Sequence, residues 1–181
     1  ELLGPITDER VLDVACGTGL LLDRLAADAP AAPLDGIDAS PHMLRRARRR
    51  LGGRAHLAVA PAQALPFSDS SFDVVVSSSA LHGVPGAPAE ILGEWLRVLR
   101  PGGRLVVTDW RPDHLGTRLQ VAALRALGIG PLRPLAPHEL TDAVRAAGAE
   151  PQRLAVYSAQ GWGLTTLAAT APAARAWTSI S

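Results

Sequence analysis

Two aspartates and two glycines near the N-terminus have the spacing of a nucleotide-binding site. Asp13 interrupts a short apolar run, and Gly17 and Gly19 follow it within one tight turn. Glycine allows positive φ and lets a ligand approach the backbone closely. Asp38 comes about twenty residues after Gly17, near the spacing at which an acid accepts hydrogen bonds from ribose hydroxyls. These residues predict a site in which a backbone turn and a carboxylate hold a nucleoside.

The elements around these residues predict the first units of a parallel α/β sheet. Val11, Leu12 and Val14 are apolar and partly β-branched, as in a strand buried on both faces, and residues 20–27 have leucines at helical spacing. Residues 34–38 indicate a second strand. Ser40 can cap the next helix, whose first turn accommodates Pro41. A strand, a glycine turn and a helix are the first half of a nucleotide-binding βαβ unit.

The rest of the chain continues this pattern. Further strands are expected at 55–60, 72–78, 104–109, 152–159 and 164–170, and further helices at 87–99, 115–127 and 137–147. The last two strands form an antiparallel pair around Gly161-Trp162-Gly163. A tail from Pro172 is expected to be loose. With no repeat or linker, residues 1–181 are predicted to be one domain.

The glycine turn does not fit the two commonest phosphate-binding motifs. A dinucleotide fingerprint needs a third glycine at position 22, which is Leu22, and a phosphate loop needs a lysine, which the chain lacks. Residues 11–19, Val-Leu-Asp-Val-Ala-Cys-Gly-Thr-Gly, instead resemble motif I of the class I S-adenosylmethionine-dependent methyltransferases. Asp-Ala-Ser-Pro-His-Met-Leu from Asp38 is similar to that family's motif II. Leu99–Asp109 also matches the turn and fifth strand of the family.

The resemblance implies a Rossmann-like sheet of seven mostly parallel strands, with helices on both faces and a C-terminal antiparallel pair. It also implies that S-adenosylmethionine is the cofactor. Asp13 and the backbone of the turn would orient its methionine end, Asp38 its ribose, and Ser78 would lie beside the reacting methyl group. The residues implied for cofactor binding are Asp13, Ala15, Cys16, Gly17, Thr18, Gly19, Asp38, Ala39, Met43, Ala62, Gln63 and Ser78.

His82 and Asp109 are the acid–base candidates that the resemblance implies. Residues 79–84 are similar to an Ala-Leu-His-His-Val segment that follows the fourth strand in many small-molecule methyltransferases, with Gly83 in place of the second histidine. A base would help if the acceptor atom is a hydroxyl oxygen. A loop histidine satisfied by its neighbours fits the sequence equally well. Cys16 occupies a position that serves backbone geometry in the family, so a thiol mechanism is not expected.

Two features depart from the family pattern. Pro61 stands where many relatives have an aspartate that accepts from the adenine amino group, so the adenine contact would fall to Ala62 or Gln63. Only twelve residues precede Asp13, whereas relatives have a longer helical segment that helps to cover the cofactor. The cover is therefore absent, supplied by another chain, or outside a fragment. These departures favour a non-catalytic cofactor-binding domain as an alternative.

The composition of the chain bears on which binding partners we expect. The 48% hydrophobic and 19% charged residues are typical of a globular protein, and a net charge of +1 points to no particular partner. An arginine run after Leu44 has no interleaved aromatic residues, so RNA modification is a weaker alternative, as is a nicotinamide-dependent oxidoreductase. The single cysteine agrees with a reducing, cytoplasmic compartment. We expect a small-molecule acceptor, no membrane segment, no metal, and leave a homo-oligomer open.

Overall fold

The computed structural model describes residues 2–130, 132–159 and 161–173. Within them, seven strands form one sheet in the order β3-β2-β1-β4-β5-β7-β6. The pairs from β3 through β5 are parallel, whereas β7 is antiparallel to both β5 and β6. This arrangement confirms the predicted fold class. The expected loose tail lies mostly outside the described residues.

The strands are β1 (Val11–Val14), β2 (Leu34–Asp38), β3 (His56–Val59), β4 (Phe72–Ser78), β5 (Leu99–Trp110), β6 (Glu150–Ala159) and β7 (Trp162–Thr170). The helices are α1 (Leu20–Asp28), α2 (Pro41–Leu51), α3 (Pro88–Arg97), α4 (Leu115–Ala126) and α5 (Pro137–Ala146), with one 3₁₀ turn, η1 (Leu81–Gly83). Among the described residues, no helix is both long and apolar enough to cross a bilayer.

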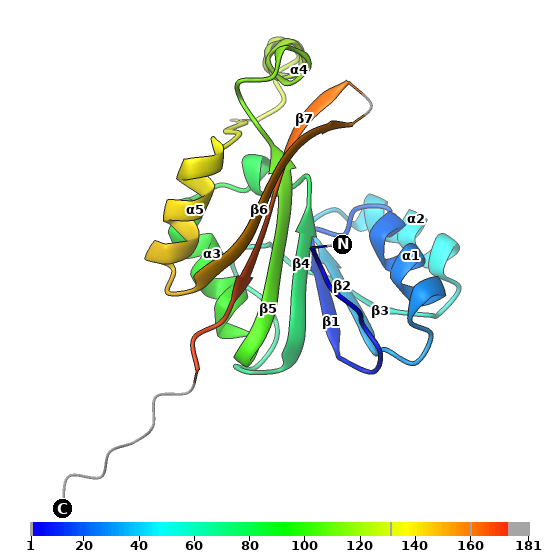
Figure 1. The fold of residues 1–181 in the computed structure, drawn as a ribbon. Coiled ribbons are helices and arrows are strands. Elements are labelled where there is room, and N and C mark those ends of the chain that lie inside the picture. The colour runs from blue at the N-terminus through cyan, green and yellow to red at the C-terminus, as the bar shows by residue number, and fades with distance from the viewer. Residues whose placement is uncertain (1, 131, 160, 174–181) are drawn as a thin grey trace, which may run out of the picture.

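Helices cover the sheet on both faces, and each face has its own core (Figure 1). Leu12 and Val14 of β1 point toward α3 and α5, where Trp95 is fully buried. Val11 points to the opposite face, toward α1 and α2. Because side chains alternate along a strand, Asp13 lies on the same face as Val11, beside α1. The alternation of side chains along each strand therefore decides which layer of helices a site residue packs against.

The fourth crossover differs from the expected helix over 87–99. Helix α3 ends at Arg97, and the carbonyl oxygen of Val98 accepts hydrogen bonds from the backbone N–H groups of Ser71 (2.8 Å) and Phe72 (3.0 Å). Leu99 then pairs with Phe72. The chain thus joins β4 before the Pro101–Gly103 turn, because strand pairing supplies partners that a longer helix would not. The final hairpin is also tighter than predicted, since β7 begins at Trp162.

Side chains from α1, β3 and the glycine turn pack closely against Gly36 of β2. A Cβ at this position would lie 2.6 Å from Leu22 Cδ1, 2.9 Å from Leu57 Cδ2 and 3.0 Å from Cys16 Sγ. Gly36→Ala should therefore lower the free energy of unfolding by about 1–3 kcal/mol through overpacking. Urea denaturation measures the change.

Gly93 supplies the matched control for that substitution. It lies in α3, and a Cβ there would meet no atom within 4 Å. Gly93→Ala should raise stability by about 0.5–1 kcal/mol, because alanine is the better helix former. Equal effects of the two alanines would contradict the packing assigned to Gly36.

Candidate functional site

The glycine turn after β1 is joined directly to the end of β2. The Asp38 carboxylate accepts hydrogen bonds from the backbone N–H of Gly17 (2.9 Å) and of Ser40 (2.8 Å). The turn needs left-handed backbone at Ala15 (φ 58°), Gly17 (φ 55°) and Gly19 (φ 73°). A Cβ on Gly17 would meet open space, so backbone conformation is what glycine provides there. The structure thus brings the two predicted halves of the site together.

Gly19 has a second role, in helix packing. A Cβ there would lie 3.1 Å from both the Ala47 Cβ and the Leu51 Cδ1 of α2. On the outer side of the turn, Arg50 Nη1 donates to the carbonyl oxygen (2.7 Å) and the hydroxyl (2.8 Å) of Thr18. The Thr18 carbonyl is therefore bound to α2, and Thr18 contributes to the site by holding the turn.

Asp13 is a buried carboxyl group at the end of β1. It is 2% exposed, and burial, followed by the negative charge of Asp38, raises its pKa to about 8. No hydrogen bond to its side chain is found in the described parts of the chain. Asp13 borders a cavity of about 410 Å³ that adjoins the glycine turn. The other residues around this cavity are Ala15, Cys16, Leu20, Leu21, Arg24 and Ser78.

These groups fit S-adenosylmethionine, the cofactor that the sequence implies. A cationic ammonium or sulfonium beside Asp13 would supply the partner that its buried carboxylate needs. Each Asp38 oxygen accepts one backbone bond, and a carboxylate oxygen has two lone pairs, so capacity remains for ribose hydroxyls. The sheet order places both acids where β1 is flanked by β2 and β4, the switch point at which such sheets bind ligands.

The loop after β3 contains the predicted adenine contacts. Ala62 is buried, and its carbonyl oxygen accepts a hydrogen bond from Trp95 Nε1 (2.7 Å). That carbonyl is therefore engaged by α3, which leaves the N–H of Ala62 and the exposed Gln63 as candidates. Met43 is exposed on the first turn of α2, and Ala39 is exposed between β2 and α2. The adenine contacts of Ala62, Gln63 and Met43 stay predictions.

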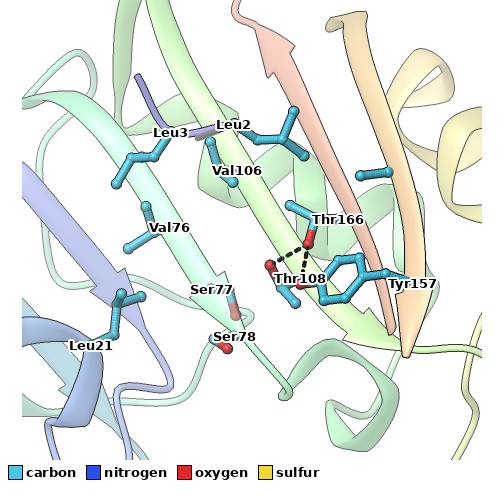
Figure 2. Close-up of a pocket in the computed structure, with 11 residues that line it drawn as sticks. Leu2, Leu3, Leu21, Val76, Ser77, Ser78, Val106, Thr108, Tyr157 and Thr166 are labelled. Atoms are coloured by element: carbon cyan, nitrogen blue, oxygen red, sulfur yellow. Dashed lines mark hydrogen bonds between the residues drawn. The ribbon is translucent and has the colours of Figure 1, made fainter. Parts of the chain in front are cut away.

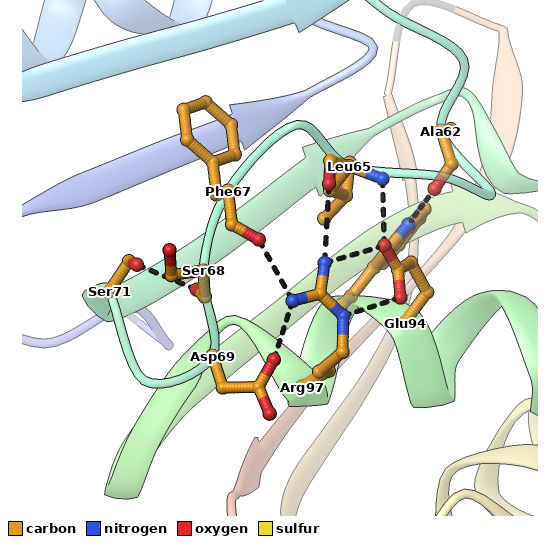
Figure 3. Close-up of polar contacts among 9 residues, drawn as sticks. Ala62, Leu65, Phe67, Ser68, Asp69, Ser71, Glu94 and Arg97 are labelled. Carbon is orange, nitrogen blue, oxygen red and sulfur yellow. Dashed lines mark hydrogen bonds and ion pairs between the residues drawn. The ribbon is translucent and has the colours of Figure 1, made fainter.

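An arginine of α3 holds the same loop in place (Figure 3). Arg97 donates to the carbonyl oxygens of Leu65 (3.2 Å) and Phe67 (2.8 Å) and to the carboxylate of Asp69 (2.7 Å). Glu94 accepts from Arg97 and from the backbone N–H of Leu65 (2.7 Å). The hydrogen bond from Arg97 lowers the pKa of Glu94. Sequence reasoning missed this cluster, for which the i, i+3 spacing of Glu94 and Arg97 was the only signal.

His82 and Asp109 form a buried pair, 7% and 3% exposed. The Asp109 carboxylate accepts from His82 Nδ1 (2.6 Å) and from the backbone N–H of His82 (2.6 Å). The ring of Trp110 stacks on the imidazole, with centroids 4.0 Å apart, and Trp162 stacks on Trp110. Asp109 therefore positions His82 through Nδ1, and a proton transfer would have to use Nε2.

Neither the Cys16 thiol nor a metal site contributes a reactive group among the described residues. Cys16 is buried, and burial together with the charges of Asp13 and Asp38 raises its pKa to about 12. A thiol of this pKa is protonated at neutral pH and is a poor nucleophile. Within the described ranges, no three His, Cys, Asp or Glu side chains are grouped as metal ligands.

The pKa of Asp13 predicts a pH-dependent stability. The unfolded chain releases this proton near its ordinary pKa of 3.8, whereas the folded protein keeps it to about pH 8. The folded state binds more protons between these values. The free energy of unfolding should therefore fall as pH rises through this window, by up to about 1.4 kcal/mol per pH unit. Urea denaturation across the window should show that Asp13→Asn removes this slope, whereas the exposed control Asp28→Asn keeps it.

Comparison with known proteins agrees with this geometry. The methyltransferase domain profile matches residues 11–103. A demethylmenaquinone methyltransferase of Clavibacter sepedonicus is 44% identical over 110 residues, covering 60% of this chain and 44% of that protein. The 27-O-demethylrifamycin SV methyltransferase of Amycolatopsis mediterranei is 33% identical over 151 residues, covering 80% of this chain and 55% of that protein.

Solved structures share the fold as well. An S-adenosylmethionine-dependent methyltransferase from Mesorhizobium loti superposes with a TM-score of 0.78 at 20% identity, covering 93% of this chain and 94% of that one. The chain spans about half the length of the curated relatives that it matches. The profile match extends from the start of β1 into β5 and so includes the glycine turn, Asp38 and His82. The chain belongs to the methyltransferase domain family, among the class I S-adenosylmethionine-dependent methyltransferases.

Proposed function

We propose that this protein transfers a methyl group from S-adenosylmethionine to a small-molecule acceptor. The observation that carries the proposal is the Asp38 carboxylate bound to the backbone N–H of Gly17 at 2.9 Å, with buried Asp13 on the adjacent strand. This arrangement places a sugar-binding acid and a partner for a cation on the two sides of one turn. Relatives named for demethylmenaquinone and demethylrifamycin support a small acceptor.

Catalysis would rest mainly on positioning. The bound cofactor supplies an activated methyl group, so holding the acceptor in line with it can provide most of the rate. Asp13 orients the methionine end of the cofactor and Asp38 its ribose, and Ser78 lies at the end of β4 beside the Asp13 cavity. His82 accepts a proton at Nε2 where the acceptor needs one removed. Asp109 holds the imidazole in the required tautomer.

The arginines of α2 do not support a nucleic acid as the methyl acceptor. Arg50 is engaged with Thr18, and Arg45 Nη2 lies 3.2 Å from His42 Nδ1. Cations in the last turns of α2 also suit the helix dipole. An assembly with a second copy and a cytoplasmic location stay predictions.

Calorimetry with S-adenosylmethionine and with NAD tests the proposed cofactor. We expect saturable heat with S-adenosylmethionine and none with NAD. Heat with NAD alone would support the oxidoreductase alternative. Absence of heat with both would contradict the cofactor assignment and favour a domain that has lost its ligand.

Asp38→Ala should weaken binding of S-adenosylmethionine by about 1–3 kcal/mol, because ribose hydroxyls lose their acceptor. It should also lower stability, since the N–H groups of Gly17 and Ser40 lose theirs. Asp28→Ala, at an exposed ion pair with Arg24, is the control and should change neither quantity appreciably. Unchanged affinity in folded Asp38→Ala would remove Asp38 from the site.

His82→Ala should leave the affinity for S-adenosylmethionine unchanged and lower kcat by about 10²–10⁴-fold for an acceptor that needs deprotonation. Release of S-adenosylhomocysteine measures kcat. Asp109→Asn should shift the pH profile of kcat in the same assay, because the imidazole loses its carboxylate partner. Wild-type turnover in folded His82→Ala would return His82 to a structural role.

A further inference from the structure

The backbone of His82 is held on both sides, but these contacts do not fix its ring. The N–H of His82 donates to Asp109 Oδ2 (2.6 Å), and its carbonyl oxygen accepts from the N–H of Arg133 (2.7 Å). The torsion that joins a histidine ring to its Cβ has a broad preference. Rotation about it would carry Nδ1 away from Asp109 Oδ1, which lies 2.6 Å from it. Another contact must therefore hold the ring edge-on to the carboxylate.

The indole of Trp110 supplies that contact. The planes of the indole and of the His82 imidazole are 17° apart, with centroids separated by 4.0 Å. Rotation of the imidazole would drive one of its edges into the indole, so the stacked arrangement opposes it. Trp110 also contacts the carboxylate, because its backbone N–H donates to Asp109 Oδ1 (2.8 Å), the same oxygen that meets His82 Nδ1.

Trp162 lies against the indole in turn. Its ring is 13° from parallel to that of Trp110, with centroids separated by 5.8 Å. Trp110 pairs with Leu164, so Trp162 is its diagonal neighbour on the same face of the sheet, a separation that aromatic side chains can bridge. The rings of His82, Trp110 and Trp162 therefore form one series, which we call the aromatic stack.

The hairpin that carries Trp162 packs closely against the start of α4 (Figure 1). A Cβ on Gly163 would lie 2.2 Å from His114 Cβ and 2.7 Å from Arg111 Cγ. The carbonyl oxygen of Gly163 accepts from the N–H of Arg111 (3.0 Å), and its N–H donates to the buried hydroxyl of Thr117 (3.3 Å). Only a residue without a side chain allows this approach, so Gly163 helps to set the position of Trp162.

Hydroxyl groups also tie the hairpin to β5, on the α1 side of the sheet (Figure 2). Thr108 Oγ1 of β5 lies 2.8 Å from Thr166 Oγ1 of β7, and Tyr157 Oη of β6 lies 3.0 Å from the same atom. These bonds join the three strands two residues before Trp110. Strand contacts thus set where Trp162 lies relative to Trp110, and the position does not depend on the two rings alone.

We propose that Trp110 is a positioning residue for His82 and that Trp162 acts through Trp110. The aromatic stack holds the neutral imidazole so that Nδ1, with its proton, faces Asp109 and Nε2 carries no proton. Only a ring nitrogen without a proton can accept one, so this tautomer is the one that the proposed proton transfer needs. The assignment rests on the proposed methyl transfer and adds the aromatic stack to the groups that support it.

Nuclear magnetic resonance of the full chain saturated with S-adenosylhomocysteine tests this role. Nitrogen shifts of the neutral imidazole report which ring nitrogen carries the proton, and a stacked indole moves the imidazole proton signals upfield. We expect His82 to have a proton on Nδ1 and upfield ring protons; a His82→Gln sample identifies its signals. His138, exposed on α5, is the internal control and should show neither feature. A wild-type His82 that carries its proton on Nε2 would overturn the proposal.

Two substitutions at Trp110 separate stacking from bulk. Trp110→Phe keeps a flat aromatic ring, so the proton should stay on Nδ1 of His82. Trp110→Leu fills space without a flat face, so we expect the upfield shift to be lost and both tautomers of His82 to be populated. Folded Trp110→Leu with wild-type nitrogen shifts of His82 would contradict the positioning role.

Two substitutions in the hairpin test the part assigned to Trp162 and leave Trp110 in place. Trp162→Leu removes the outer ring, and Gly163→Ala pushes the hairpin away from His114 and Arg111. Each should reduce the upfield shift of the His82 ring protons without abolishing it, because both act through Trp110. An unchanged His82 spectrum in both variants would overturn the role of Trp162.

Binding of S-adenosylhomocysteine, measured by calorimetry on the same samples, separates the two proposals. If the cofactor product binds and Trp110→Leu leaves the tautomer of His82 unchanged, the positioning role fails and methyl transfer stands. If the folded wild type does not bind the product, the proposed function fails, and the positioning role fails with it.

Discussion

The carboxylate of Asp38 is the interaction on which the proposed site depends. One oxygen receives the N–H of Gly17 in the turn after β1, and the other receives the N–H of Ser40 at the start of α2. A single side chain therefore fixes the glycine turn, the end of β2 and the entry to the next helix relative to one another. The same carboxylate keeps lone pairs free for a sugar, so binding and scaffold share one group.

The proximity of Asp38 also shapes the chemistry of Asp13. Burial and the neighbouring negative charge keep the Asp13 carboxyl protonated up to about pH 8. A cationic ligand would offset both effects, because it supplies the opposite charge that the protein does not provide there. The Asp13 carboxylate is unfavourable without a ligand, so this site is suited to binding a cation.

The end of β4 connects the Asp13 cavity with the His82–Asp109 pair. Ser78 borders the Asp13 cavity. Directly after it the chain turns through left-handed Ser79 (φ 56°), and the Ser79 N–H bonds to the carbonyl oxygen of Thr108. The chain then reaches His82, whose partner Asp109 directly follows Thr108 in β5, so the two side chains lie on opposite faces of the sheet.

Local patterns in the sequence were enough to predict the sheet and the proximity of Gly17 and Asp38. Both follow from short apolar runs, glycine positions and the spacing of two strand ends that parallel pairing brings to one edge. Long-range contacts were not readable in this way. Arg97 meets Leu65 and Phe67 through carbonyl oxygens, which no residue type reveals. The end of α3 depended on Val98 pairing with residues far back in the chain. The local pattern predicted the β6–β7 hairpin, but not that β7 pairs with β5.

A crystal structure of the protein with S-adenosylhomocysteine tests the central claim most directly. The account predicts ribose hydroxyls within hydrogen-bonding distance of the Asp38 carboxylate, and the amino group of the homocysteine end beside Asp13. A nucleoside bound elsewhere, or protein atoms filling the space between Gly17 and Asp38, would contradict it.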